Sequence, residues 1–297
     1  MSASATVGER VRTFASLVKL SHSVFALPFA LLSLLTATGG RPAPVKLALV
    51  VAAVVAARTA AMAYNRFADR AIDAANPRTR GREIPRGVVT PAQALVLTGS
   101  AGAAFVVACG LLAPLCLWLS LPTLGWLLGY SHVKRFSAAC HLWLGVALGL
   151  SPVAAWLAVD GEFGPRLWAP TALGLGVAAW VAGFDVLYAC QDEAFDRAHG
   201  LHSAPARFGA ARAMWSARLL HTAALAGFVG FAALAPLGVT FFAGIGLAAV
   251  LLVWQHALLR PGDLSRIGTA FFTANGVLSL ALLAAGCLDI YVFAPVR

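Results

Sequence analysis

Long uninterrupted apolar runs constrain this chain more than any other feature of its sequence. A helix that crosses the hydrocarbon core of a bilayer needs about 20 mostly apolar residues. Nine segments approach or reach that length: 22–39, 44–64, 93–113, 115–133, 139–159, 168–190, 213–235, 236–258 and 268–289. None has the period-two alternation of a barrel strand. The sequence predicts an all-α polytopic membrane protein, with nine transmembrane helices bundled around a central cavity and residues 1–297 forming a single domain.

The composition excludes a water-soluble domain. Hydrophobic residues make up 60% of the chain and charged residues 11%, whereas about a quarter of a soluble domain is charged. The five cysteines show no metal-ligand spacing, and we interpret them as small buried hydrophobic residues. The first apolar segment has no small-residue cleavage site, so we expect it to be retained as a span.

The basic residues predict the orientation in the membrane. All but four of the 22 lysines and arginines lie in the N-terminal tail, in the loops after the even-numbered segments, or at the adjoining helix ends. The positive-inside rule makes that side cytoplasmic. We therefore expect a multi-pass protein of a bacterial plasma (inner) membrane, with the N-terminus inside and the C-terminus outside. This asymmetry explains the net charge of +10 without a nucleic-acid partner.

Acidic residues gather on the same side, in two groups with helical spacing. The first group, at the end of the second segment, is Asn65, Asp69 and Asp73. The second, at the end of the sixth segment, is Asp185, Tyr188, Asp192 and Asp196. Each set of spacings places its members on one helical face. Because four crossings separate the groups, both lie on the predicted cytoplasmic side.

Such repeated acids require a compensating cation. Like charges four residues apart repel, and an aspartate near the middle of a span costs about 2.5–3.5 kcal/mol on insertion scales. Carboxylate oxygens suit Mg²⁺, which typically links carboxylates to substrate phosphates. The sequence therefore predicts a magnesium diphosphate site at the cytoplasmic rim of the bundle.

Basic residues close to these acids are candidates for binding the diphosphate. The four candidates are Arg66, Arg70, Lys134 and Arg135. Arg78 and Arg80 are interpreted as positive-inside charge. A diphosphate site above an apolar bundle indicates an amphiphilic substrate, and a polyprenyl diphosphate has that character. The allylic cation that it forms would need a dry cavity and an acceptor held close to it.

The chain resembles, over essentially its whole length, the UbiA superfamily of intramembrane aromatic prenyltransferases. The family's first motif, N-D-x-x-D-x-x-x-D, is similar to residues 65–73, and its second, D-x-x-Y-x-x-x-D-x-x-x-D, to residues 185–196. The resemblance implies a nine-helix bundle. The chain departs from the family at Arg66, where many members have Asp, and this removes one possible metal ligand.

The resemblance also implies roles for the site residues. Asp69, Asp73, Asp192 and Asp196 would hold Mg²⁺, with Asn65 beside them at the diphosphate. Lys134 would contact the diphosphate, and Arg135 the carboxylate of an aromatic acid. Asp185 and Tyr188 would lie by the reacting ring and, with Asp192, form the catalytic set. His22 could face the pocket; the other histidines, including His141, are interpreted as packing or hydrogen-bonding residues.

Three functions stay open at this point. The overall pattern is most similar to enzymes that join a polyprenyl group to 4-hydroxybenzoate for ubiquinone biosynthesis. Residues 130–141 and 200–209 are more similar to a branch that prenylates a related aromatic acid for futalosine-type menaquinone synthesis. An ion-coupled transporter is the alternative of a different class, because intramembrane acids also mark ion pathways.

Overall fold

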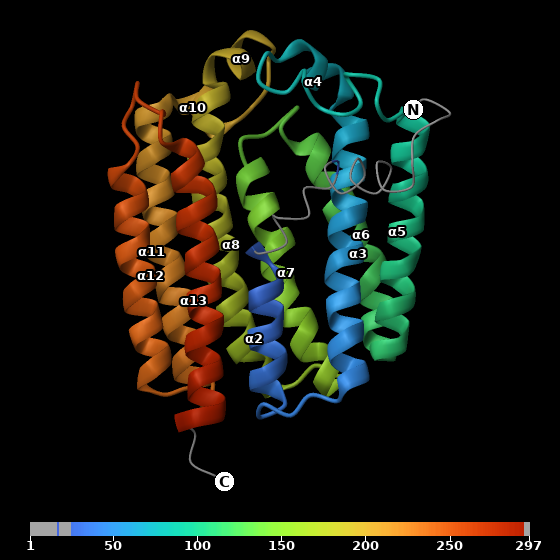
Figure 1. Cartoon of the computed structure of the whole chain (residues 1–297), viewed down its shortest axis with the longest axis vertical. Coiled ribbons are helices and arrows are strands. Elements are labelled where there is room, and N and C mark those ends of the chain that lie inside the picture. The colour runs from blue at the N-terminus through green and yellow to red at the C-terminus, as the bar shows by residue number, and fades with distance from the viewer. Residues whose placement is uncertain (1–16, 18–24, 294–297) are drawn as a thin grey trace.

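The computed structural model describes Leu17 and residues 25–293, and these residues form helices with no strand beyond one isolated bridge. Nine helices lie side by side as a bundle (Figure 1). They are α2 (Leu27–Ala37), α3 (Pro44–Ala68), α5 (Pro91–Leu112), α6 (Pro114–Val133), α7 (Cys140–Asp160), α8 (Trp168–Ala189), α11 (Ala210–Leu234), α12 (Val239–Ala257) and α13 (Asn275–Leu288). Each of the nine predicted segments therefore corresponds to a helix.

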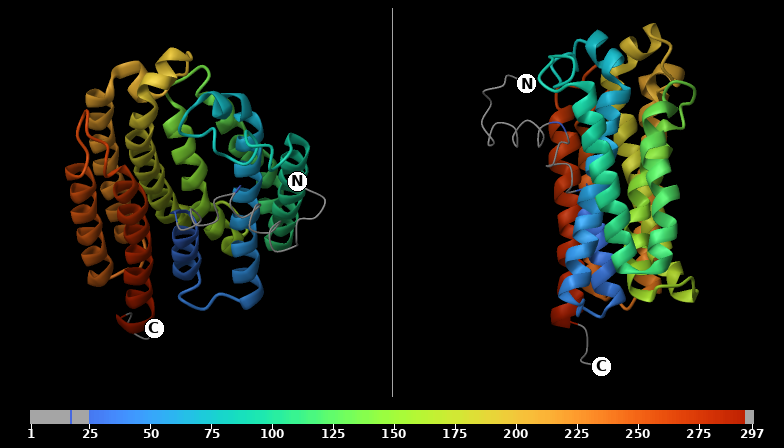
Figure 2. Two further views of the ribbon diagram at one scale, coloured as in Figure 1. Left: turned by 45° about the horizontal axis from the view of Figure 1, so that its top comes forward. Right: turned by 90° about the vertical axis from the view of Figure 1, so that its right-hand side faces the viewer.

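Three short helices, α4 (Arg70–Ala75), α9 (Glu193–Ala198) and α10 (Ala204–Phe208), lie together at one end of the bundle. We call this the acid-motif end, because it carries both groups of acids. Helix α13 finishes at the opposite end (Figure 1). The turned views in Figure 2 keep the same arrangement, with the long helices running between the two ends.

Seven of the helical segments are long and apolar enough to cross a membrane. The described part of α2 has 11 residues, and α6, which is not among the seven, contains Pro122 and two tryptophans between its leucines. Large apolar side chains such as Leu111, Trp118 and Val253 remain exposed on the outer surface, as expected where lipid replaces water. A multi-pass helical architecture is confirmed, and the number of nine crossings stays a prediction.

The helix boundaries follow local sequence signals. Helices α3, α5 and α6 each begin with a proline, which has no N–H to lose in a first helical turn. Thr90 and Gln93 form a reciprocal capping box at the start of α5. A single residue, Ala113, separates α5 from α6, so these two helices form a tight hairpin.

The segment Pro165–Ala198, which contains α8, is the most enclosed of the seven, with 67% of its most apolar 18-residue stretch buried against 22–39% in the other six. Helix α8 contacts α7 on one side and α11 on the other. Glycines allow the α7–α8 approach: a Cβ added to Gly145 would collide with the carbonyl oxygen of Ala178, and one added to Gly149 would collide with that of Gly174. The backbone of α8, and with it the second acid group, is therefore fixed against α7.

An aromatic cluster fills the core beside the inner part of α8. We define it as Phe25, Trp180, Phe184, Tyr188 and Phe271. Ring centroids lie 5.4 Å apart for Phe25 and Phe184, 5.2 Å for Phe184 and Phe271, and 4.4 Å for Tyr188 and Phe271. The cluster lies directly below the acid-motif end, since Tyr188 belongs to it.

A π-helical turn, Thr269–Ala274, delivers Phe271 to that cluster. The buried Asn275 amide donates to the carbonyl of Phe271 at 2.8 Å, and the Trp180 indole donates to Oδ1 of Asn275 at 2.9 Å. A π-helical turn departs from the regular hydrogen-bond pattern of an α-helix. Here the side chain of Asn275 donates to one of the backbone carbonyls of the turn, that of Phe271.

Two tryptophans fasten α6 to α7. The indole rings of Trp126 and Trp143 stack with centroids 3.7 Å apart and planes 7° from parallel. Each indole N–H also donates to the other residue's carbonyl oxygen, at 3.1 Å from Trp126 and 2.8 Å from Trp143. This pair lies within the helices on either side of the loop that carries Lys134 and Arg135.

The close α7–α8 crossing predicts a sharp difference between two glycine substitutions. Gly145→Ala should destabilise the protein by about 1–3 kcal/mol, because the new methyl group has no space against Ala178. Gly125→Ala in α6 is the matched control. Apart from the adjoining residues and backbone of α6 itself, no heavy atom of the described residues lies within 4 Å of the place its methyl group would occupy. Thermal denaturation in detergent measures both, and equal melting temperatures would contradict the packing described here.

Candidate functional site

The first acid group continues one helical face across the joint between α3 and α4. The backbone N–H of Asp69 donates to the carbonyl of Asn65 at 2.9 Å, and that of Asp73 to the carbonyl of Asp69 at 2.8 Å. The four-residue helical hydrogen-bond pattern therefore continues from α3 into α4. Asp69 and Asp73 are both buried.

Asp69 is held by three donors. Lys134 Nζ lies 2.7 Å from Oδ2, Arg135 Nη2 3.1 Å from Oδ1, and the Asn65 amide nitrogen 2.9 Å from Oδ2. The Asp69 side chain is only 2% exposed. A buried carboxylate needs such partners, because desolvating an unpaired charge costs several kcal/mol.

Asp73 has a different cation. Nη1 of Arg82 lies 2.7 Å and 2.9 Å from its two carboxylate oxygens. The hydroxyl of Thr79 donates to the Asp73 backbone carbonyl at 3.1 Å. Both partners come from the loop after α4, which therefore folds back over the first acid group.

The second acid group begins in α8, passes through a short 3-10 turn (Cys190–Asp192) and ends in α9. Asp192 accepts hydrogen bonds from Arg78 Nε at 2.9 Å, Arg78 Nη2 at 2.5 Å and the Asn76 amide at 3.0 Å. Arg78 Nη1 donates to the Tyr188 hydroxyl at 3.2 Å. Burial alone would lower the pKa of Arg78, but its hydrogen bond to Asp192 and the Asp192 charge outweigh burial and raise that pKa.

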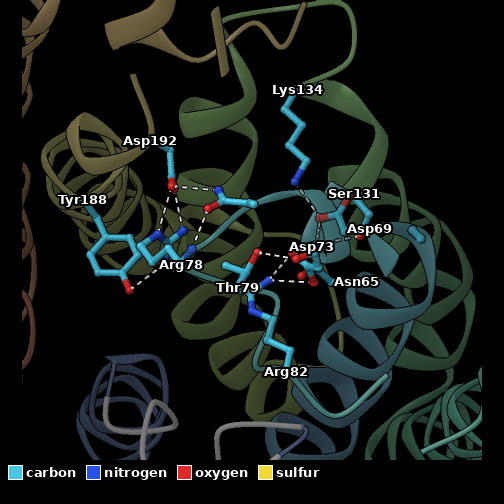
Figure 3. A network of polar contacts seen from close by, with 12 residues as sticks. Asn65, Asp69, Asp73, Arg78, Thr79, Arg82, Ser131, Lys134, Tyr188 and Asp192 are labelled. Carbon is cyan, nitrogen blue, oxygen red and sulfur yellow. Dashed lines mark hydrogen bonds and ion pairs between the residues drawn. The ribbon is translucent and has the colours of Figure 1, made fainter. Parts of the chain in front are cut away.

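Residues 76–82 connect the two acid groups (Figure 3). Asn76 and Arg78 bind Asp192, and four residues further on Arg82 binds Asp73. Oδ1 of Asn76 also accepts a hydrogen bond from the backbone N–H of Arg78 at 2.9 Å, which holds these two residues in a fixed arrangement. Acids more than 100 positions apart in sequence therefore share one network at the acid-motif end.

A further pair joins α7 and α8, with His141 buried and Asp185 partly buried. Nδ1 of His141 is 2.6 Å from Oδ2 of Asp185, and the backbone N–H of Ala204 donates to His141 Nε2 at 3.1 Å. His141 thereby joins α7, α8 and α10. Asp185 precedes Tyr188 by one turn of α8, so these two side chains lie on one face of that helix.

A model of the UbiA prenyltransferase family matches residues 26–277. The chain belongs to this family. It is 32% identical, over 96% of either chain, to a protein of Aromatoleum aromaticum named 4-hydroxybenzoate octaprenyltransferase. It is 30% identical to a protein of the same name from Azoarcus sp., covering 96% of this chain and 98% of the relative.

Solved structures of UbiA homologs share the fold. The apo structure of a homolog from Aeropyrum pernix K1 superposes with a TM-score of 0.81 at 32% identity, covering 90% of this chain and 98% of that one. A homolog from Archaeoglobus fulgidus bound to DMAPP and Mg²⁺ superposes with a TM-score of 0.74 at 18% identity, covering 94% and 99%.

The structure brings together most of the residues predicted for the site, but not all. Arg70 donates to the Phe67 carbonyl at 2.8 Å and lies over the Phe67 ring, and it forms no ion pair with the acids of the described residues. Arg66 is buried in α3, and its Nε has no hydrogen-bond partner among the described residues. Asp196 lies on α9, and His22 lies outside the described residues.

Two residues of this UbiA-family site were assigned only background roles from the sequence. The interpretation of Arg78 as topology charge alone was wrong, because Arg78 binds Asp192. His141 is a hydrogen-bonding residue, as interpreted, but its partner is the motif residue Asp185. A usable signal existed for both. The five aspartates of the two groups outnumber the four cations assigned to them, and His141 lies at the start of the apolar segment that follows Lys134 and Arg135.

The donor atoms of the site fit a hard divalent cation. The carboxylates of Asp69, Asp73 and Asp192 and the amide oxygen of Asn65 are ligands of the type that Mg²⁺ prefers. Within the described ranges, however, no three acids, histidines or cysteines are grouped closely enough to form a ready metal site. Lysine and arginine neutralise the carboxylates instead, so a bound cation would replace some of those contacts.

The Asp73–Arg82 pair predicts a non-additive pair of variants. Arg82→Met leaves the Asp73 carboxylate buried without its cation and should cost about 3 kcal/mol of unfolding free energy. Adding Asp73→Asn should recover much of that loss, because the unpaired charge is then gone. Detergent melting curves of the two single variants and the double variant measure this, with Arg80→Met as a control on the same loop. Additive losses would contradict the pairing.

Proposed function

We propose that the chain is a prenyltransferase that joins a polyprenyl diphosphate to an aromatic acid of the 4-hydroxybenzoate type, with Mg²⁺, in quinone biosynthesis. The observation that carries the proposal is the meeting of both acid groups, bridged by residues 76–82, directly above the aromatic cluster. The names of the curated relatives at 30–32% identity support the same reaction class.

The diphosphate would bind at the acid-motif end. Asp69, Asp73, Asp192 and Asp196 would hold magnesium, with Asn65 completing the oxygen donors. Magnesium bound there would neutralise charge on the departing diphosphate. The cations now paired with these acids, Arg78, Arg82 and Lys134, are placed to turn to the phosphate oxygens instead.

The prenyl tail would lie among the apolar helices, below the diphosphate. Phe184 and Phe271 present aromatic rings there and exclude water from the reacting allylic carbon. Asp185 and Tyr188 would lie between the prenyl tail and the diphosphate, where the acceptor ring would meet the allylic carbon. Arg135 is the candidate for the carboxylate of the acceptor.

The membrane arrangement is part of the proposal. One domain with nine spans, N-terminus inside and C-terminus outside, would place the acid-motif end on the cytoplasmic side of the plasma membrane. A transporter would need polar groups along a path across the bilayer. The paired acids of the two motifs gather instead at one end, which favours group transfer.

Replacing Asp192 should separate chemistry from folding. Asp192→Asn should lower magnesium-dependent turnover by at least about 100-fold, in the range expected when a stabilising charge at the reacting centre is lost. Glu193→Gln is the matched control, because Glu193 is the next residue along the chain and pairs with Arg197 within α9, not with a residue of the bridging segment 76–82. Size-exclusion profiles in detergent should be unchanged for both. Full turnover by folded Asp192→Asn protein would rule out the role of Asp192.

An acceptor panel tests the reaction class and the choice of acid. Membranes containing the protein should release diphosphate from a polyprenyl diphosphate and form a prenylated ring only when both Mg²⁺ and an aromatic acid are present. EDTA should abolish both products. Comparing 4-hydroxybenzoate with larger aromatic acids decides between the ubiquinone and futalosine-type alternatives. Diphosphate release with no prenylated ring for any acceptor would exclude aromatic prenyl transfer.

A further inference from the structure

His141 makes two hydrogen bonds that together fix its proton. Nε2 accepts the N–H of Ala204, so Nε2 carries no proton. A neutral imidazole has one N–H, which must then be on Nδ1. Nδ1 lies 2.6 Å from Oδ2 of Asp185 and donates to it. The backbone N–H of Ala204 on α10 thus selects the Nδ1–H tautomer of His141, which is the tautomer that can donate to Asp185 on α8.

The Asp185 carboxylate has one oxygen engaged by His141 and one that is not. Its Oδ2 is taken by His141, while Oδ1 receives no hydrogen bond from the side chains and backbone in the described ranges. The Asp185 side chain is 19% exposed, against 5% for His141. Asp185 precedes Asp192 by seven residues, which is about 10 Å at 1.5 Å per residue, and the last three of those residues form the 3-10 turn Cys190–Asp192. One carboxylate oxygen is therefore fixed by His141, and the other remains available to accept a proton.

We propose that His141 is a positioning residue that holds Asp185 as the acceptor of the ring proton, an inference that rests on the proposed function. The allylic C–O bond breaks and its electron pair leaves with the diphosphate. A π pair of the acceptor ring forms the new C–C bond. The proton on that ring carbon then moves to Oδ1 of Asp185, and the C–H electron pair restores the aromatic ring.

Two isosteric variants separate the two hydrogen bonds of His141. The Asn amide nitrogen can occupy the place of Nδ1, so His141→Asn keeps a donor for Asp185. The Gln amide reaches the place of Nε2, so His141→Gln keeps an acceptor for Ala204 and loses the donor. A packing role would make both variants similar. A positioning role predicts that the Asn variant retains kcat for the prenylated product within about threefold, and that the Gln variant loses at least about tenfold with little change in KM.

A third variant leaves His141 untouched. Ala204 is the first residue of α10, and Ser203 before it has an extended backbone with φ −75° and ψ 157°, so Ala204→Pro fits both positions. It removes the N–H that selects the tautomer. ¹⁵N spectra of labelled histidine, with His141 assigned by its loss in the Asn variant, should show an Nδ1–H tautomer in the unmodified protein and a mixture in Ala204→Pro.

The outcomes distinguish this inference from the proposed function. If the unmodified protein forms no prenylated ring, the proposed function and the positioning role both fail. If it forms the product while folded Asn and Gln variants have equal kcat, the positioning role alone fails. An Nε2–H tautomer in the unmodified protein also overturns it, and this readout holds even if a variant does not fold.

Discussion

Neutralising buried carboxylates at one end of an apolar bundle is the constraint on which the site depends. Asp69 and Asp73 have almost no exposed side-chain surface, and unpaired charges there would be too costly for a stable fold. Their cations come from loops, not from the helices that carry the acids. The path of residues 76–82 is therefore set by charge, and that path brings the two acid groups together.

The helices were predictable because the bilayer fixes their length. Apolar runs of about 20 residues have few alternatives in a membrane, and each predicted run corresponds to a helix. The single-residue turn at Ala113 was predictable from the following proline. Membership of the two acid groups in one site was also predictable, since spacing and sidedness both pointed to the same end.

The partners of the acids were harder to predict, for a physical reason. Arg78 lies 114 positions from Asp192, and nothing local distinguishes it from Arg80, which follows two residues later in the same loop. The choice depends on how the loop turns through Asn76 and Thr79. The joint at Asp69 and the π-helical turn before Asn275 likewise follow from tertiary contacts, which override helical periodicity.

The stacked pair of Trp126 and Trp143 has a mechanical consequence. Two rings in face-to-face contact, locked by reciprocal hydrogen bonds, prevent α6 and α7 from sliding past each other. A motion that opens the loop bearing Lys134 would therefore move α6 and α7 together as one rigid pair, and His141 on α7 would move with them. Because stacked indoles couple optically, near-ultraviolet circular dichroism can report on the contact between α6 and α7 without an added label.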